Sequence, residues 1–465
     1  MYNHENQYRC TIIRGKAKKQ IDDFLPAYAK VIDDICPCDK QTFITKFNTA
    51  FKNYLPPDKQ VIKTLNNHRT EIAGSLFGMY YIDADSTVYI SEKTQKFLSD
   101  NDQPAFFKEL CYKLQFPNGM QKIKTVQQRK ADGIKVRPLA FLLKTLLIAK
   151  NAGFSLDKKE IGYYILNSLD VLQGKATPLE VVEQITKDKK LNIYRTIPIV
   201  KASSFHYQHI NEQINYLELA NLVVEIDHII YLNMKEEHAI NIIADCWDLP
   251  LDFDVYAYNL DTDEEKNVFQ NDWDYYYSQL SKEVDNFETT AEALNIEEKV
   301  IPSGTVTSIS TSTNKKEIGD SGEKYVFDYE KKRVSSFNSR LANKVIHLGE
   351  TKGLGYDIQS VIAESGKPAE AEFVKYIEVK STKRVTEPDI DNNLWLDTIN
   401  LTRNEWVAAQ QHKEYYSIYR VYFVRGKTIM FVINNLYQKK IDGKVNITPM
   451  TYRVEFNTDA IDLQL

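Results

Sequence analysis

Two stretches near the end of the sequence decide its interpretation, Gly-Tyr-Asp-Ile at residues 355–358 and Lys-Tyr-Ile-Glu-Val-Lys-Ser at residues 375–381. The second stretch alternates apolar and polar residues and is rich in residues that favour strands. Alternate residues of a strand project to the same face, so Glu378 and Lys380 point together while Val379 faces the core. The sequence therefore predicts a strand that carries an acidic and a basic side chain on one face.

The first stretch supplies a further acid. Residues 356–363 favour a second strand, which places Asp357 beside Glu378 if the two strands pair. Mg²⁺ prefers oxygen ligands and keeps several waters, so Asp357, Glu378 and the Val379 carbonyl can bind it together with a phosphate. Lys380 can favour the hydroxide form of the attacking water and offset charge in the transition state. The pattern predicts phosphodiester cleavage; the alternative is a surface ion pair on an exposed strand.

Four motifs lie within residues 318–436, about a quarter of the chain: Gly322-Glu323, 353–358, 377–382 and 401–406. Together they resemble the PD-(D/E)XK nucleases, in particular the domain found at the C-terminus of many restriction and phage-defence proteins. The resemblance implies an α/β domain with a mixed central sheet, Asp357 and Glu378 as ligands of Mg²⁺, and Lys380 as the catalytic lysine. Tyr356 stands where the family name has proline, at a position that varies within the family.

Three further polar residues are weaker candidates for the same site. Glu323 follows Asp320 by three positions, which is the spacing of a capping box, so it either caps a helix or lies beside the metal. Glu405 follows Thr402 at the same spacing and has the same two interpretations. Gln410 lies further along this second helix and faces either the site or the solvent.

The length of the chain and one biased segment predict its domains. A chain of 465 residues exceeds one ordinary core and suggests about three domains. Eight of the eleven residues from 303 to 313 are Ser or Thr, which predicts a flexible linker. We expect an N-terminal helical module at 1–130, a second recognition region at 131–300, the linker at 301–316 and the nuclease-like domain at 317–465.

A weak repeat occurs upstream, in which a helix precedes two short strands. Residues 69–77 favour a helix before a hairpin at 79–90, and residues 212–222 favour a helix before a hairpin at 223–232. Between them lie three stretches with helical periodicity: 138–151, 157–169 and 178–186. Helix and hairpin form the outline of a winged helix, which often places a helix in the DNA major groove. We expect a mainly helical, winged-helix-like N-terminal region; protein interaction and dimerisation are the alternative uses of such units.

The net charge of −5 hides an uneven distribution. Residues 121–150 contain eight Lys or Arg against one Asp, whereas acids dominate residues 252–298. A local basic face is compatible with DNA binding, and a solvated surface run is the alternative. The candidate DNA-binding residues are Lys122, Lys124, Arg129, Lys130, Lys135 and Arg137.

Composition also bears on the cellular compartment. The five cysteines are few and irregularly spaced, so they are expected to be free thiols of a reducing compartment. We see no signal-peptide pattern, and the longest apolar run, at 138–149, is too short for a membrane span. We therefore expect a cytoplasmic protein without membrane contact. The chain has no phosphate-binding loop, so ATP hydrolysis is not expected.

These features predict a Mg²⁺-dependent restriction-type endonuclease that recognises specific double-stranded DNA through its N-terminal modules and cuts it with its C-terminal domain. One such site cuts one strand, so a double-strand break requires a homodimer, a second protomer met on DNA, or successive nicks. A cognate DNA methyltransferase would complete an ordinary restriction system. The alternatives are a modification-dependent defence nuclease and a non-cutting DNA-binding subunit of a defence complex.

Overall fold

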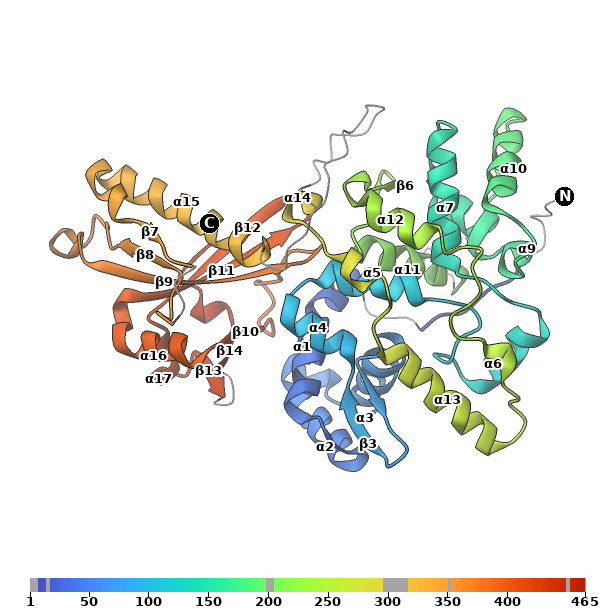
Figure 1. Cartoon of the computed structure of the whole chain (residues 1–465), viewed down its shortest axis with the longest axis horizontal. Helices are drawn as coiled ribbons and strands as arrows, with labels where there is room; N and C mark the ends of the chain where they lie inside the picture. Colours follow the sequence, from blue (N-terminus) through green and yellow to red (C-terminus); the bar gives the residue numbers. More distant parts are fainter. Residues whose placement is uncertain are drawn as a thin grey trace. The chain divides into compact units, whose positions relative to one another are not determined.

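The computed structural model of the chain describes residues 7–13, 17–197, 205–295, 317–349, 353–448 and 452–464. The chain forms two compact units, unit 1 over Met1–Thr289 and unit 2 over Thr290–Leu465, whose elements are drawn in Figure 1. The predicted linker at 301–316 lies outside the described residues, and the predicted boundary at residue 130 stays a prediction. All five cysteines are free. No helix among the described residues is long and apolar enough to cross a membrane.

Unit 1 is mostly helical, as the sequence predicts. Its principal helices are α1 (Lys18–Ile35), α2 (Lys40–Phe51), α3 (Ile62–Asn66), α4 (Glu92–Asp100), α5 (Gln103–Lys113), α6 (Ile123–Ala131), α7 (Pro138–Asn151), α8 (Lys158–Ile161), α9 (Leu169–Leu172), α10 (Pro178–Lys190), α11 (Phe205–Leu219), α12 (Glu237–Ala244) and α13 (Asp263–Ser278). The helix expected at 138–151 is α7, with the same bounds. α10 begins where expected because Thr177 and Glu180 form a capping box at its start.

Two three-stranded sheets in unit 1 share one arrangement. Their strands are β1 (Cys38–Asp39), β2 (Tyr80–Ile82) and β3 (Thr87–Ile90), and β4 (Leu156–Asp157), β5 (Val223–Ile226) and β6 (Ile229–Leu232). The strand orders are β1-β3-β2 and β4-β6-β5. In each sheet, the second strand of the hairpin therefore pairs with a two-residue strand from further upstream. The helix before the hairpin is the π-helical segment η3 (Asn67–Leu76) in one case and α11 in the other. The predicted repeat of helix and hairpin is therefore confirmed.

The core of unit 1 is one buried cluster with members on both sides of residue 130. Phe43, Phe47 and Phe51 follow one another at intervals of four on α2, so they share one face of the helix. The Tyr28 ring of α1 stacks on Phe51, with the ring centroids 4.9 Å apart. Aromatic packing of this kind holds the helices of unit 1 together.

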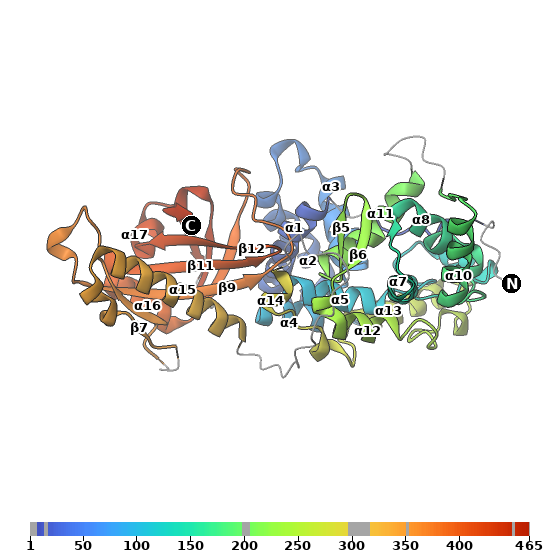
Figure 2. The same ribbon diagram turned by 90° about the horizontal axis from the view of Figure 1, so that it is seen from above.

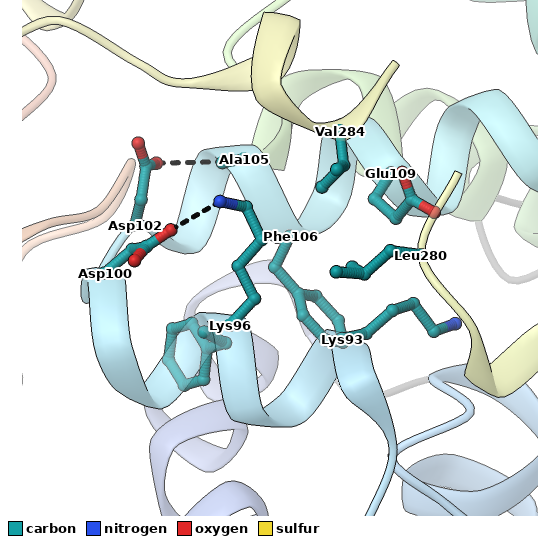
Figure 3. Close-up of a pocket in the computed structure, with 10 residues that line it drawn as sticks. Lys93, Lys96, Asp100, Asp102, Ala105, Phe106, Glu109, Leu280 and Val284 are labelled. Carbon is teal, nitrogen blue, oxygen red and sulfur yellow. Dashed lines mark hydrogen bonds and ion pairs between the residues drawn. The ribbon is translucent and has the colours of Figure 1, made fainter. Parts of the chain in front are cut away.

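A small hollow in unit 1 lies between α4 and α5 (Figure 3). Its volume is about 20 Å³, which is room for about one water molecule. Two of the charged side chains around it have hydrogen-bond partners: Lys96 donates to Asp100 at 2.8 Å, and Asp102 caps the start of α5. The ammonium of the buried Lys93 lies 3.6 Å from the centroid of the Tyr277 ring. This hollow belongs to the packing of unit 1 and is too small for a ligand.

Unit 2 is built around a mixed six-stranded sheet with the order β15-β12-β11-β9-β8-β7. Its strands are β7 (Ile346–His347), β8 (Ile358–Val361), β9 (Val374–Lys383), β11 (Tyr416–Val424), β12 (Lys427–Asn434) and β15 (Leu463–Gln464). β9 and β11 run parallel and the other neighbours run antiparallel. A smaller sheet consists of β10 (Asp397–Leu401), β14 (Tyr452–Phe456) and β13 (Val445–Thr448). The expectation of an α/β unit with a mixed central sheet is confirmed.

Helices cover both faces of the large sheet (Figures 1 and 2). The helices of unit 2 are α14 (Ala291–Leu294), α15 (Glu317–Phe337), α16 (Arg403–His412) and α17 (Leu436–Ile441). On one face, Val326 of α15 packs in a cluster with Ile377 of β9. On the other face, Trp406 of α16 packs in a cluster with Ile418 of β11. β9 is thus enclosed between α15 and α16.

A buried polar network ties α15 to the sheet. The carboxylate of Glu330 accepts hydrogen bonds of 2.6–2.9 Å from Arg333, Ser360 and Tyr419. Lys375 of β9 in turn donates to the Tyr419 hydroxyl at 3.0 Å. A buried charge is tolerated only where it is paired and hydrogen-bonded, so this network fixes the position of α15 along β9.

Candidate active site

Asp357 lies directly before β8, at the point where β8 meets β9. Its backbone N–H donates to the Ile377 carbonyl at 2.9 Å, and its carboxylate accepts from the Val379 N–H at 2.8 Å. The register continues with Ile358 opposite Ile377. The antiparallel pairing of the two strands therefore places Asp357 next to the segment that carries Glu378.

Lys380 joins two carboxylates. Its Nζ lies 2.7 Å from Oε1 of Glu378 and 3.0 Å from Oε2 of Glu405. Glu378 and Lys380 project to one face of β9 because they are two residues apart, while Val379 packs in the core on the other face. The structure thus brings Asp357, Glu378 and Lys380 together at one place on the sheet.

Glu405 caps the start of α16 and also contacts Lys380. Its carboxylate accepts from the Thr402 N–H at 2.9 Å, and the Thr402 hydroxyl accepts from the Glu405 N–H at 3.3 Å, which completes a capping box at the start of α16. The oxygen that accepts from Thr402 is also the one that contacts Lys380. The start of α16 therefore helps to hold the ammonium in place. Gln410 is exposed further along α16, which fits the solvent-facing alternative.

The capping interpretation of Glu323 is wrong. The described part of α15 begins at Glu317, so Glu323 lies in the second turn and not at the start of the helix. Its Oε2 lies 2.6 Å from Nε2 of His347, at hydrogen-bonding distance. His347 pairs with Ile358, the residue after Asp357, so this contact lies beside the site. Sequence periodicity gives no signal for His347 because β7 is only two residues long.

Two glycines let the helices approach the strands of the site. A Cβ on Gly322 of α15 would overlap the Ser381 hydroxyl of β9. A Cβ on Gly355, where φ is +79°, would lie 2.5 Å from the Asn404 carbonyl oxygen of α16. Any larger residue would therefore push α15 or α16 away from the strands that carry the charged groups. A glycine inside a helical pattern, as at Gly322, is the sequence signal for such a close approach.

Burial sets the ionisation of the site. The Glu378 side chain is almost fully buried, and this burial raises its pKa well above the usual range. Burial likewise raises the pKa of Asp357 to about 6. Burial alone would lower the pKa of Lys380, but the carboxylates of Glu378 and Glu405 raise it. Lys380 is therefore a cation at neutral pH, and it lies beside two carboxyl groups, those of Asp357 and Glu378, that burial makes costly to ionise.

The oxygen atoms of the site are of the kind that a hard divalent cation binds. When ionised, Asp357, Glu378 and Glu405 carry three negative charges against the one positive charge of Lys380. Carboxylate and carbonyl oxygens are the ligands that Mg²⁺ prefers. Within the described ranges, no group of three or more His, Cys, Asp or Glu side chains is arranged to hold a metal. The predicted set of Asp357, Glu378 and the Val379 carbonyl contains only two such side chains.

The predicted basic residues of unit 1 differ in their exposure. Lys122, Lys124 and Lys135 are exposed at the ends of α6 and beyond it. Lys130 is half-buried, and its ammonium donates to the Tyr258 carbonyl. Three of the six candidates are therefore fully available to a phosphate backbone in this structure.

The two arginines of the same segment are interior residues. Arg129 and Arg137 are each 2% exposed. Arg129 donates to the Thr11 carbonyl, whereas Arg137 donates to the Pro250 carbonyl at 2.8 Å and pairs with Asp252 at 3.0 Å. Both guanidinium groups join segments that are distant in sequence, so these two residues are not part of an exposed basic surface. This corrects the expectation that Arg129 and Arg137 belong to a local basic face.

Comparison with known protein families defines the class of the chain. Residues 2–274, more than half of the chain, match the family model described as restriction endonuclease BpuJI, N terminal. The chain therefore belongs to this restriction-endonuclease family. Residues 322–433 match a second family model, described as protein NO VEIN, C-terminal.

One solved structure gives a particular relative. It is described as a crystal structure of pyrene- and phenanthrene-modified DNA in complex with the BpuJ1 endonuclease binding domain. The two sequences are 48% identical, the match covers 60% of this chain and 100% of that one, and the TM-score is 0.58. A comparison with curated proteins found no match.

Asp357→Asn should stabilise the metal-free protein at pH 8. The pKa of Asp357 is about 6 in the folded state and about 4 in an unfolded chain, so the ionised carboxylate opposes folding at pH 8. This cost shrinks as the pH falls from 6 towards 4, because the folded state then holds the proton. We expect a gain of about 2 kcal/mol in the free energy of unfolding at pH 8, and about half of it at pH 5.

Denaturant titrations in the presence of a chelator measure both values. Asp328→Asn, a change at an exposed position of α15, is the matched control and should alter the stability little at either pH. A loss of stability in Asp357→Asn at pH 8 would contradict the electrostatics described for the site.

Proposed function

We propose that the chain is a Mg²⁺-dependent restriction-type endonuclease in which unit 1 binds double-stranded DNA and unit 2 hydrolyses phosphodiester bonds. The observation that carries this proposal is the ion pair of Glu378 and Lys380 beside Asp357. Membership of a restriction-endonuclease family supports it. A mixed sheet enclosed by helices, with this group at the junction of two strands, also supports the assignment of unit 2 to the PD-(D/E)XK nucleases.

The residues of unit 2 have separate roles in this proposal. Asp357, Glu378 and the Val379 carbonyl would hold Mg²⁺, which when bound activates a water and draws charge from the phosphate. Glu378 and Glu405 keep the Lys380 ammonium charged and in place. Lys380 can then donate a hydrogen bond to the attacking water or to a phosphate oxygen. Low exposure to solvent strengthens each of these interactions.

Glu323 acts as a positioning residue in this proposal. Its contact with His347 ties α15 to the edge strand β7, next to the strand that follows Asp357. Gly322, the preceding residue, brings α15 against β9. Glu323 thus helps to keep the acidic groups at the distance that a shared cation requires.

Unit 1 supplies DNA recognition in this proposal. Its relative is a binding domain solved in complex with DNA. The common order of the two small sheets, with a short strand, helices and then a hairpin, supports their interpretation as winged helices. Exposed lysines near α6 would contact the phosphate backbone, which positions a protein on DNA without reading sequence.

A double-strand break needs two cleavage events, and unit 2 supplies one candidate site per chain. We propose that two chains meet on the DNA to cut both strands. A DNA methyltransferase that protects the same sequence would be the functional partner of such an enzyme. Cleavage of unmodified DNA and protection by methylation would separate this activity from that of a modification-dependent nuclease.

Glu378→Ala and Lys380→Ala should each lower Mg²⁺-dependent cleavage by a factor of about 100 or more, because each removes a charge from the site. DNA binding should stay within a few-fold of the parent, because unit 1 carries recognition. Gel assays of nicked and linear DNA measure cleavage, and anisotropy measures binding. Glu387→Ala is the matched control, since Glu387 forms an exposed ion pair with Lys427 in the same unit. Equal cleavage by both variants and the parent would show that the site is misassigned.

Replacing Lys122 and Lys124 together with Ala should weaken DNA binding and flatten its dependence on salt. Each lost phosphate contact lowers the slope of log K against log salt concentration by about 1. Binding titrations at several salt concentrations give this slope. Lys59→Ala is the control, because Lys59 is an exposed lysine outside this segment. An unchanged slope in the double variant would exclude these two lysines from the DNA interface.

A further inference from the structure

A second and larger hollow lies in unit 2, where β9 begins and α16 ends. Its volume is about 540 Å³, within the range of sites that bind small ligands. Four ring-bearing side chains line it, together with charged groups at the rim. The rings belong to Phe373, Tyr376, His412 and Tyr415.

The rings of this hollow form two groups. Tyr376 and His412 stack with their centroids 3.7 Å apart, and Tyr356 meets both of them edge-on at 4.8 and 6.2 Å. Phe373 is 50% exposed and lies edge-on to Tyr415 at 6.0 Å. Burial lowers the pKa of His412, so its ring is neutral at pH 7 and stacks as an uncharged aromatic. The hollow therefore offers aromatic surface to a flat, uncharged ligand.

The hollow and the candidate active site are built from the same segments. Tyr376 projects from β9 to the same face as Glu378, two residues further along. His412 follows Glu405 by seven residues on α16, so both lie on one face of the helix, about 10 Å apart along its axis. A nucleic-acid strand with a phosphate at the candidate active site can therefore reach the hollow with a neighbouring nucleotide.

The charges at the rim decide which part of a nucleotide fits. The charged lining residues are Glu372, Lys413 and Glu414, and Glu372 is paired with Lys344 at 2.5 Å. The rim thus has no excess of positive charge, which a phosphate would need. A nucleobase is uncharged, and every base has a face that stacks on aromatic side chains. Carboxylates at the rim can also accept hydrogen bonds from exocyclic amino groups.

We propose that this hollow binds one unstacked nucleobase of the strand whose phosphate enters the candidate active site. This inference rests on the proposed nuclease function of unit 2 and specifies its substrate. A base held by Phe373 and Tyr415 fixes the strand relative to Lys380. The base must leave its stack and its partner to enter, so unit 2 takes strand ends or locally opened DNA in preference to an intact duplex.

Photo-crosslinking of the full chain tests this directly. Single-stranded oligonucleotides with 5-iodouracil at one scanned position are irradiated with the protein in a chelator, and the adduct is mapped by mass spectrometry. We expect adducts on residues 372–376 or 411–416. Phe373→Ser and Tyr415→Ser should each lower their yield by about fivefold or more, as loss of a stacking partner predicts. Phe337→Ser, at a half-exposed aromatic of α15 outside the hollow, should leave the yield unchanged.

Each outcome has a separate meaning. Adducts that map elsewhere, or equal yields in the parent and both hollow variants, overturn the base site. Thermal melts establish that each variant is folded, and either of the two hollow variants suffices for the test. The assay needs neither metal nor cleavage. If the protein cuts DNA but gives no adduct at these residues, only the proposed base site is rejected. If it gives an adduct at these residues but does not cut DNA, only the proposed nuclease function is rejected.

Discussion

The buried ion pair between Lys380 and Glu378 sets the chemistry that unit 2 can perform. A carboxylate in the interior stays charged only with a cation close to it, and the alternation of strand β9 supplies an ammonium two residues away. Glu405 ties the same ammonium to the start of α16, on the layer that covers this face of the sheet. The pairing of β8 with β9 then adds Asp357 to the group.

Without a further cation, this arrangement of carboxyl groups lowers the stability of the folded protein. Burial raises the pKa of Asp357 and of Glu378, so ionising either carboxyl group costs free energy, and the Lys380 ammonium offsets only part of that cost at Glu378. Contacts elsewhere in unit 2 hold these carboxyl groups close together. The Glu330 network fixes α15 against the sheet, and Gly355 lets the Asp357 loop lie against α16. Stability given up at one site and recovered elsewhere is typical of binding and catalytic centres.

Local patterns predicted the parts of the molecule that depend on neighbours in sequence. The two-residue period of β9 put Glu378 and Lys380 on one face, and Pro138 marks the start of α7. The parts that depend on distant contacts were not predictable in this way. The sequence predicted that Arg129 and Arg137 lie on a basic surface, but both are buried and contact residues more than 100 positions away.

The same limit applies to the weaker elements and to the position of helix starts. The strands β1, β4 and β7 are two residues long and carry no periodicity. A capping-box spacing is common, and it gave the right local structure at Glu405 but the wrong one at Glu323, because α15 starts earlier in the chain. The hollow beside His412 depends on the stacking of β9 and α16, which no single stretch of sequence encodes.

Calorimetric titration of Mg²⁺ into the full chain near pH 6, in buffers of different ionisation enthalpy, tests most directly whether this group of residues shares a cation. Burial raises the pKa of Asp357 to about 6, so Mg²⁺ binding near pH 6 should displace protons from this carboxyl group, and the measured heat should vary with the buffer. The heat should disappear in Glu378→Gln. A parent protein that binds no Mg²⁺, or a Glu378→Gln variant that binds it as tightly as the parent, would contradict the proposed metal site.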